Sequence, residues 1–343
     1  MVPRVPRGEG QIPRRGQGRL RVRDVPQAHT ASLRAGGGRG IVAGRSRPPL
    51  KVAQSRGPAR RPGRRRVVEL RELAIDYPAG SNSYRSSERV PAVSGSSATF
   101  ATGGISAIVG PSGCGKTSIV HAIAGLLSPS SGEVLVEGEP VRGVRRRTAV
   151  IFQDYGLLPW LTVEGNAALP LALDGVGRSE RRRRVRPVLD ELGLSAFGRF
   201  YPSGLSGGMK QRVAIARALT SEPDLLLMDE PFSSLDALTR EAAQEFLLGV
   251  RRSRPLTIVV VTHSIEEAAY LAESVFVMGG RNPGVIKERF DVPENGSAIR
   301  FPIGDGPSGI ADFRSAPRYL ELCAAIRASL RGGGPIDDAG EPR

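Results

Sequence analysis

The chain has 343 residues, of which 40% are hydrophobic, enough for the core of one large domain or two smaller ones. Its net charge of +15 comes from residues 1–66, which carry 18 Lys and Arg against two acidic residues, whereas the remainder carries 31 against 32. The main domain is therefore not basic, two cysteines are too few for a disulfide framework or a zinc site, and no apolar run approaches the ~20 residues needed to cross a bilayer.

Residues 1–66 are rich in Arg, Gly and Pro and have no hydrophobic periodicity, which predicts a disordered tail. Such a tail could bind nucleic acid, tether the chain to anionic lipid or act as a targeting peptide. We favour a solvated, dispensable extension or an over-extended start site, because charge runs are usually solvated. No apolar segment follows Arg14 and Arg15, which argues against a secretory or twin-arginine signal.

From about Val67 onward, short β-branched runs alternate with helical ones, which predicts an α/β domain with a mostly parallel sheet. The expected strands are Val67–Ile75, Ile105–Val109, Ala149–Phe152, Leu225–Met228, Ile258–Val261 and Val275–Met278. The expected helices are Lys116–Leu127, Ser206–Leu219, Ala237–Arg251 and Ile265–Ala272, with Ser206 and Asp236 as N-caps.

Three other stretches break this alternation. Residues 78–96 are rich in Gly and Ser and predict a loop or an irregular hairpin, and residues 154–205 predict a helical subdomain in which Arg181–Arg186 form a solvated face. After Val285 we expect loop until a last helix, Pro317–Leu330, with one apolar stripe of Leu320, Cys323, Ile326 and Leu330. The predicted domains are thus a tail (1–66), the α/β domain with its helical subdomain (67–290) and a C-terminal extension (291–343).

The strand Ile105–Val109 leads into GPSGCGKT, which matches the phosphate-binding pattern G-x-x-x-x-G-K-[ST] between a strand and a helix. Glycines let backbone N–H groups turn toward phosphates, and the helix N-terminus favours negative charge. Lys116 is expected to neutralise the outer phosphates and Thr117 to ligate Mg²⁺. An ordinary Gly-rich turn is the alternative. The predicted nucleotide-binding residues here are Gly110, Pro111, Ser112, Gly113, Cys114, Gly115, Lys116, Thr117 and Ser118.

A second signal is the apolar run Leu225–Met228, which ends in Asp229 and Glu230. A buried strand delivers both carboxylates to the sheet edge where α/β proteins bind ligands. We expect Asp229 to organise Mg²⁺ and Glu230 to orient and deprotonate the attacking water. Many strands end in acidic residues at the surface, so this signal depends on the phosphate loop upstream.

About 20 residues before Asp229 the chain reads LSGGMKQR, from Leu205 to Arg212, and here the sequence resembles the ABC ATPase family, whose signature motif is LSGGQ or close to it. Ser206, Gly207 and Gly208 at a helix N-terminus form a second phosphate cradle. In the family, the first cradle of one subunit faces the second cradle of its partner across two ATP molecules. The resemblance therefore implies a second ATPase subunit, most simply an identical one.

The resemblance extends to the other family motifs. Gln153 is similar to the glutamine that senses Mg²⁺ and contacts the membrane subunit, and Asp236, in Ser-Leu-Asp, lies in a segment that resembles the D-loop. His263 resembles the switch histidine that holds the γ-phosphate and Glu230. Tyr77 stands where the family has an aromatic residue that stacks on adenine. Cys114, at a helix N-terminus, is expected to favour its thiolate.

The segment LLPWLTV, from Leu157 to Val163, is similar to the nitrate, sulfonate and taurine importer ATPases. Either these apolar residues fill the helical subdomain, or they dock a permease helix, with Trp160 as an aromatic anchor. The resemblance implies an ATPase at the cytoplasmic face of the membrane, working with permease subunits and, indirectly, an extracytoplasmic substrate-binding protein. The rival interpretation is a non-transport ABC ATPase that acts on nucleic acid or ribosomes through the arginine tail. We expect no nucleic-acid partner.

Overall fold

The computed structural model describes residues 68–78, 89–292 and 314–331. The predicted tail, residues 1–66, lies outside these ranges, as do residues 79–88 of the predicted loop and much of the C-terminal extension. Within the described part, no helix is long and apolar enough to cross a membrane.

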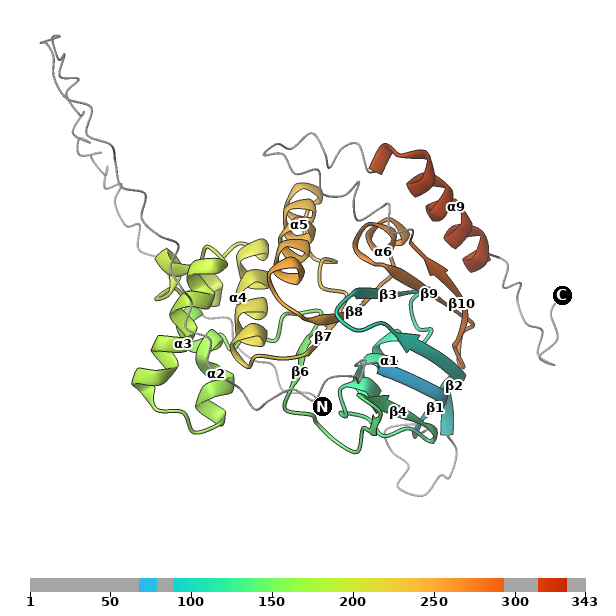
Figure 1. The fold of residues 1–343 in the computed structure, drawn as a ribbon, viewed down its shortest axis with the longest axis horizontal. Coiled ribbons are helices and arrows are strands. Elements are labelled where there is room, and N and C mark those ends of the chain that lie inside the picture. Colours follow the sequence, from blue (N-terminus) through green and yellow to red (C-terminus); the bar gives the residue numbers. More distant parts are fainter. Residues whose placement is uncertain (1–67, 79–88, 293–313, 332–343) are drawn as a thin grey trace, which may run out of the picture. The chain divides into compact units, whose positions relative to one another are not determined.

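A six-stranded sheet forms the centre of the domain (Figure 1). Its order is β10 (Val285–Asp291), β9 (Ser274–Gly279), β3 (Ile105–Val109), β8 (Thr257–Thr262), β7 (Leu225–Asp229) and β6 (Thr148–Ile151). The strands from β9 to β6 are parallel, and only β10 is antiparallel to its neighbour. Every residue of β3, β7, β8 and β9 is buried, as expected for a parallel sheet covered on both faces. The predicted α/β class is confirmed.

A second, antiparallel sheet has the order β2 (Arg89–Phe100), β1 (Val68–Pro78), β4 (Ser131–Val136) and β5 (Glu139–Pro140). Helix α1 (Lys116–Ile123) shares an apolar core with both sheets, in which the rings of Phe100 and Phe276 lie 4.7 Å apart. Gly284 joins the sheets directly, because its N–H donates to the carbonyl of Ala92 and its carbonyl accepts from the N–H of Ser94.

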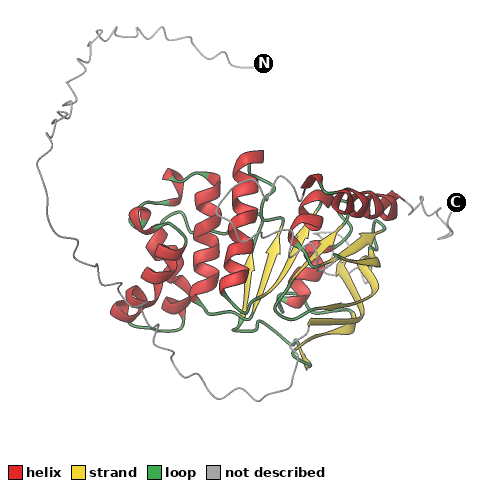
Figure 2. Cartoon of the chain, turned by 45° about the horizontal axis from the view of Figure 1, so that its top comes forward, coloured by secondary structure: helices red, strands yellow, loops and turns green. Residues whose placement is uncertain are grey.

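Helices α2 (Val163–Leu173), α3 (Arg178–Glu191), α4 (Gly207–Thr220) and α5 (Ala237–Ser253) pack together at the β6 end of the larger sheet (Figure 2). The chain between α3 and α4 makes two short 3₁₀ turns, Ser195–Phe197 and Pro202–Gly204. Ser206 and Asp236 cap α4 and α5 by accepting from the N–H groups of Met209 and Thr239, which confirms both predicted N-caps. Pro187 lies inside α3.

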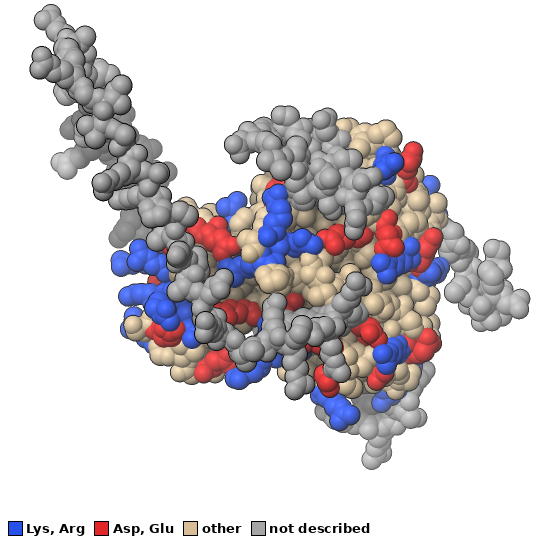
Figure 3. Space-filling view, viewed as in Figure 1, with Lys and Arg blue, Asp and Glu red and all other residues tan. Residues whose placement is uncertain are grey.

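The arginine run of α3 is a solvent-exposed face, as predicted. The Arg182 and Arg183 side chains are 68% and 76% exposed and pair with Glu164 and Glu180. Basic side chains gather at this edge of the molecule (Figure 3). Exposed ion pairs of this kind contribute little to the free energy of unfolding. The arginines of α3 therefore serve mainly to keep this face of the helix in contact with water.

Residues 89–96 belong to the long strand β2, which pairs with β1 through several register shifts, as the irregular-hairpin alternative predicted. Two sequence expectations were wrong. Residues 285–291 form strand β10 where loop was expected. The last helix, α9 (Pro317–Arg331), exists, but its buried stripe is Tyr319, Cys323 and Ile326, whereas Leu320 is 55% exposed. This stripe packs α9 on α6 (Ile265–Leu271) and on β9.

Candidate functional site

The phosphate-binding loop lies between β3 and α1 and wraps around the ammonium group of Lys116. Lys116 is 5% exposed, and its ammonium group donates to the carbonyl oxygens of Gly110 and Pro111, both at 2.9 Å. Gly115 has φ +91°, in the region that favours glycine, and a Cβ on it would lie 2.7 Å from the carbonyl oxygen of Ala92. The loop is therefore held by its own lysine and by the neighbouring antiparallel sheet.

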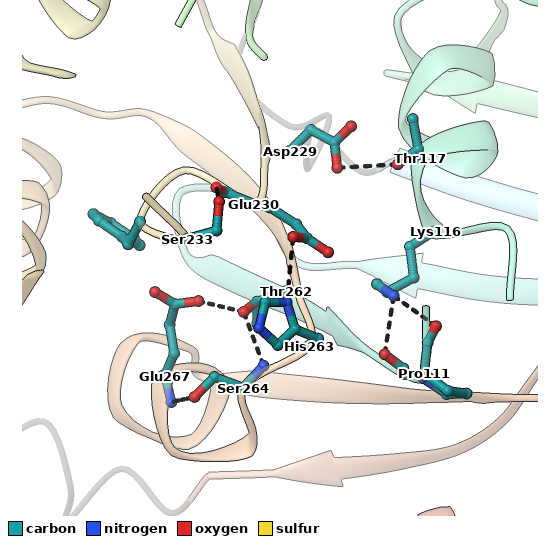
Figure 4. A network of polar contacts seen from close by, with 12 residues as sticks. Pro111, Lys116, Thr117, Asp229, Glu230, Ser233, Thr262, His263, Ser264 and Glu267 are labelled. Atoms are coloured by element: carbon teal, nitrogen blue, oxygen red, sulfur yellow. Dashed lines mark hydrogen bonds and ion pairs between the residues drawn. The ribbon is translucent and has the colours of Figure 1, made fainter. Parts of the chain in front are cut away.

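Two of the three predicted magnesium ligands, Thr117 and Asp229, meet at the start of α1 and the end of β7, whereas the third, Gln153, follows β6. The Thr117 hydroxyl donates to Oδ1 of Asp229 at 3.2 Å (Figure 4). Burial raises the pKa of the Asp229 carboxyl, which is 7% exposed, although the Thr117 hydrogen bond opposes the shift. A hydroxyl and a carboxylate supply the oxygen ligands that Mg²⁺ prefers. The described residues hold no cluster of three or more His, Cys, Asp and Glu that could bind a metal ion.

Glu230 and His263 face each other across the ends of β7 and β8 (Figure 4). Nδ1 of His263 lies 3.2 Å from Oε2 of Glu230, whose side chain is 19% exposed. Glu230 has φ +45°, uncommon for a residue with a side chain. Its N–H donates to the carbonyl of Val261 and its carbonyl accepts from the Ser233 hydroxyl. These bonds hold the strained backbone in a turn that aims the carboxylate at the histidine.

The second phosphate cradle lies at the N-terminus of α4. Ser206 and Gly207 are exposed and Gly208 is half-buried. A Cβ on Gly207 would lie 2.9 Å from Leu235, so this cradle packs against the segment that leads to Asp236. Within the described part of the chain, no hydrogen bond joins residues 206–208 to residues 110–118. The structure thus brings the first loop, Asp229, Glu230 and His263 together and leaves the second cradle facing solvent.

Gln153 is exposed just beyond β6, in a segment that the rest of the protein holds tightly. The guanidinium group of Arg217, on α4, donates to the backbone carbonyls of Tyr155 and Gly156. The Tyr155 hydroxyl lies 2.9 Å from the hydroxyl of Ser234. The segment after Gln153 is therefore bonded both to the helix of the second cradle and to the turn before Asp236.

Tyr77 lies beside the first loop. Its hydroxyl lies 3.0 Å from the hydroxyl of Ser118 on α1, and the residue is 38% exposed. The Tyr77 side chain thus reaches the first turn of α1, directly after the phosphate-binding loop, and is partly exposed to solvent. This geometry suits an aromatic contact with a base, and that role stays a prediction.

The expectation that Cys114 favours its thiolate is wrong. The side chain is 0% exposed, and burial raises the pKa of its thiol despite the nearby Lys116. The cost of burying a charged sulfur outweighs the helix N-terminus and the lysine. Cys114 therefore fills space beneath the loop as a neutral side chain.

The sequence analysis missed a group of residues behind His263. The buried Glu267 carboxylate accepts from the hydroxyl of Thr262 and from the side-chain amide of Gln244 at 3.2 Å. Burial raises the pKa of this carboxyl. The available signal was an acidic residue on the apolar side of the short helix that follows the histidine.

A phosphate loop, a paired hydroxyl and carboxylate, and a histidine at the ends of adjacent parallel strands define a P-loop nucleotide-binding domain. The family model described as "ABC transporter" matches residues 93–233. The chain is 40% identical over 264 residues to the taurine import ATP-binding protein TauB of Pseudomonas fluorescens, covering 77% of this chain and 94% of that protein. It is 44% identical to the corresponding protein of Rhizobium johnstonii over 65% of this chain and 82% of that one.

The solved structures agree with these relatives. The fold is similar to cbiO1 of Clostridium perfringens, part of an ABC transporter complex, with a TM-score of 0.59 and 23% identity over 77% of this chain and 99% of that one. It is also similar to the ATP-binding cassette MJ0796, solved as a dimer in a post-hydrolysis state with ADP and Pi, with a TM-score of 0.56 and 30% identity over 66% and 99%. The chain belongs to the ATP-binding proteins of ABC transporters, and as such it is an ATPase.

Proposed function

We propose that this chain is the ATPase subunit of an importer for a small anion such as taurine, another sulfonate or nitrate, and that it works as a head-to-tail pair on the cytoplasmic face of the membrane. Relatives named as taurine import ATP-binding proteins, matched over most of their length, support the importer. The observation that carries the proposal is the site itself. One complete phosphate loop meets a carboxylate–histidine pair, while a second cradle faces solvent.

The phosphate-binding loop between β3 and α1 binds the nucleotide. The backbone N–H groups of residues 110–118 and the N-terminus of α1 bind the phosphates, and Lys116 turns its ammonium group from the loop carbonyls to the outer phosphates. Tyr77 stacks on the adenine next to Ser118. Thr117 and Asp229 would hold Mg²⁺, with Gln153 reaching the same site from the end of β6. When bound, the ion neutralises the developing charge on the transferred phosphoryl group.

Glu230 and His263, at the ends of β7 and β8, carry out hydrolysis. The Glu230 carboxylate accepts a proton from water and directs the oxygen at the terminal phosphorus. Nδ1 of His263, 3.2 Å from Oε2 of Glu230, sets the direction of the carboxylate, and we expect the same imidazole to contact the γ-phosphate. The left-handed backbone at Glu230 fixes the same direction from the main chain.

The exposed second cradle supports a pair of subunits. Ser206, Gly207 and Gly208, with Asp236 behind them, present a helix N-terminus and free backbone N–H groups that are not bonded to the first loop. A second copy turned head to tail supplies this cradle to the γ-phosphate of the first. Closing the pair then depends on ATP in both sites.

The helical subdomain supplies the surface for a permease. Trp160 is 69% exposed and Leu173 79%, whereas Leu157 packs on the core. The exposed tryptophan argues against the core-filling interpretation for this residue. Aromatic side chains of this kind are enriched as anchors at protein interfaces. A substrate-binding protein outside the membrane would then select the anion, since this chain meets only the permease.

The decisive experiment uses Glu230→Gln with MgATP and full-length protein. We expect nucleotide binding close to wild type, turnover reduced by roughly a hundredfold or more because the base is lost, and a dimer trapped by ATP in size-exclusion chromatography. Adding Ser206→Glu should leave nucleotide binding intact but return the protein to a monomer. Wild-type turnover in Glu230→Gln would refute the role of Glu230. Loss of nucleotide binding in monomeric Ser206→Glu would refute the contact between subunits.

The anion is tested separately. In vesicles that hold the permease and the binding protein, taurine, an alkanesulfonate and nitrate are supplied one at a time, and ATP hydrolysis is measured. We expect one of the three to stimulate hydrolysis. Equal rates with all of them and with none would refute the proposed substrate class.

A further inference from the structure

The C-terminal segment reaches the switch histidine through a chain of polar contacts. Arg314, just before α9, forms an ion pair with Glu241 and donates to Oε1 of Gln244 at 2.9 Å, and its guanidinium carbon lies 4.4 Å from the ring centroid of Tyr270. Arg314 lies outside the segment matched by the family model, residues 93–233. A planar guanidinium can make all these contacts at once, because its donors form a rigid fork and its face stacks on a ring.

Gln244 links Arg314 to the buried Glu267. Its Nε2 donates to Oε1 of the buried Glu267, while its Oε1 accepts from Arg314. Arginine can only donate, so Oε1 of Gln244 faces Arg314 and the Nε2 donor is left for Glu267. Arg314 therefore fixes which end of Gln244 faces Glu267.

Glu267 in turn holds the two residues on either side of His263. The Thr262 hydroxyl donates to Oε2 of Glu267, and the N–H of Ser264 donates to the same Thr262 hydroxyl at 3.1 Å. The Ser264 hydroxyl also accepts from the N–H of Glu267 at 3.1 Å. In Figure 4, Thr262, Ser264 and Glu267 form a closed set of contacts behind the imidazole ring.

We propose that Arg314 is a positioning residue for ATP hydrolysis. Through Gln244 and Glu267 it fixes the peptide segment 262–264, and so the direction from which His263 meets Glu230. Helix α9 holds Arg314 in place, because the Tyr319 hydroxyl donates to the backbone carbonyl of Glu266 at 3.0 Å. The inference rests on the proposed roles of His263 and Glu230, and it adds a control of that pair by the C-terminal segment.

The first test compares Arg314→Ala and Arg314→Lys with Arg327→Ala in the full chain. Arg327 lies on α9 and pairs with the Glu266 side chain at 2.7 Å, so its removal takes a cation from the helix that follows Arg314 without touching Gln244. We expect both Arg314 variants to lower kcat for MgATP by roughly three- to tenfold with KM and nucleotide binding unchanged, and Arg327→Ala to stay within twofold. Arg314→Lys keeps the charge but lacks the fork, so it remains informative if Arg314→Ala folds poorly.

The second test is a double-mutant cycle with Gln244→Leu. If the contacts act as one chain, adding Arg314→Lys to Gln244→Leu should change kcat by less than twofold, because the path is already broken. Independent multiplication of the two losses would overturn the inference, as would an Arg314 effect on KM alone or an equal loss in Arg327→Ala. His263→Ala separates the two claims. Wild-type activity there would refute the role of His263, whereas an inactive His263→Ala with unaffected Arg314 variants would refute only the role of Arg314.

Discussion

Asn166 is the best place to test how the exposed Trp160 segment is held. Its side chain is 0% exposed. Oδ1 accepts from the N–H of Leu158 at 2.8 Å, and Nδ2 lies 3.0 to 3.1 Å from the carbonyls of Leu158, Leu161 and Thr162. One amide thus closes the loop on both sides of the tryptophan and leads it into α2.

Replacing Asn166 with Ala removes one accepted bond and the two bonds that the amide hydrogens can donate. At about 1 kcal/mol net for each, the loss is about 3 kcal/mol. For a domain of this size, that lowers the thermal midpoint by about 6 to 12 °C. Circular dichroism melts of the full chain measure the shift.

Asn166→Asp is the matched control because it keeps the size and the accepted bond from Leu158. Its carboxylate faces backbone carbonyls to which it cannot donate, so at pH 8 it should be at least as destabilised as Asn166→Ala. At pH 5 the loss should be smaller, because burial favours the protonated form, which restores one donor. A shift below about 2 °C in Asn166→Ala, or a pH-independent loss in Asn166→Asp, would refute this reasoning.

Three further outcomes follow from groups around the site. Cys114, with its raised pKa, should react with iodoacetamide far more slowly in the folded chain at pH 8 than in urea; equal rates by peptide mass spectrometry would contradict its burial. Gly115→Ala should abolish nucleotide binding in a fluorescent-ATP titration, because its Cβ meets a backbone oxygen at 2.7 Å, and retained affinity would show that the loop adapts. Glu267 binds its proton more tightly folded than unfolded, so its contribution to stability falls as pH rises from about 4.5 through the folded pKa. In urea unfolding, the free energy of unfolding of Glu267→Gln should therefore rise relative to that of wild type as the pH rises through this range. A difference that does not change with pH would refute the raised pKa of Glu267.

The parallel strands were predictable because each is a short apolar run with no polar face. Leu225–Asp229 and Thr257–Thr262 are buried at every position, so composition alone identifies them. The phosphate loop was predictable from the spacing of its glycines, lysine and threonine, which is also a local pattern. Each of these signals lies within about ten consecutive residues.

The choice between a loop and an irregular hairpin stayed open for residues 78–96, because the sequence of β2, RVPAVSGSSATF, has little intrinsic strand preference. Strand β2 forms through pairing along β1 and through Val93 and Phe100, which are 0% exposed in the core. That contact depends on residues far apart in the chain. The local pattern therefore could not reveal it.

The site likewise combines residues that a local pattern predicts with contacts that only the folded chain creates. The acidic end of an apolar strand predicted Glu230 and the family resemblance predicted His263, whereas their 3.2 Å approach and the contacts behind them come from the folded sheet. The thiolate prediction for Cys114 weighed the helix N-terminus and could not weigh burial. Neither Gln244 nor Arg314 carries a local signal, because their roles come from side chains 23 and 70 residues away along the chain.

The junction at Gly284 bears on how readily the nucleotide is bound. A Cβ there would lie 1.9 Å from the carbonyl oxygen of Cys114, so the turn after β9 touches the phosphate loop backbone to backbone. The same glycine is hydrogen-bonded to Ala92 and Ser94 of the antiparallel sheet. Two distant stretches of main chain thus hold the loop in shape before any phosphate binds, and little conformational entropy remains to be lost when ATP binds.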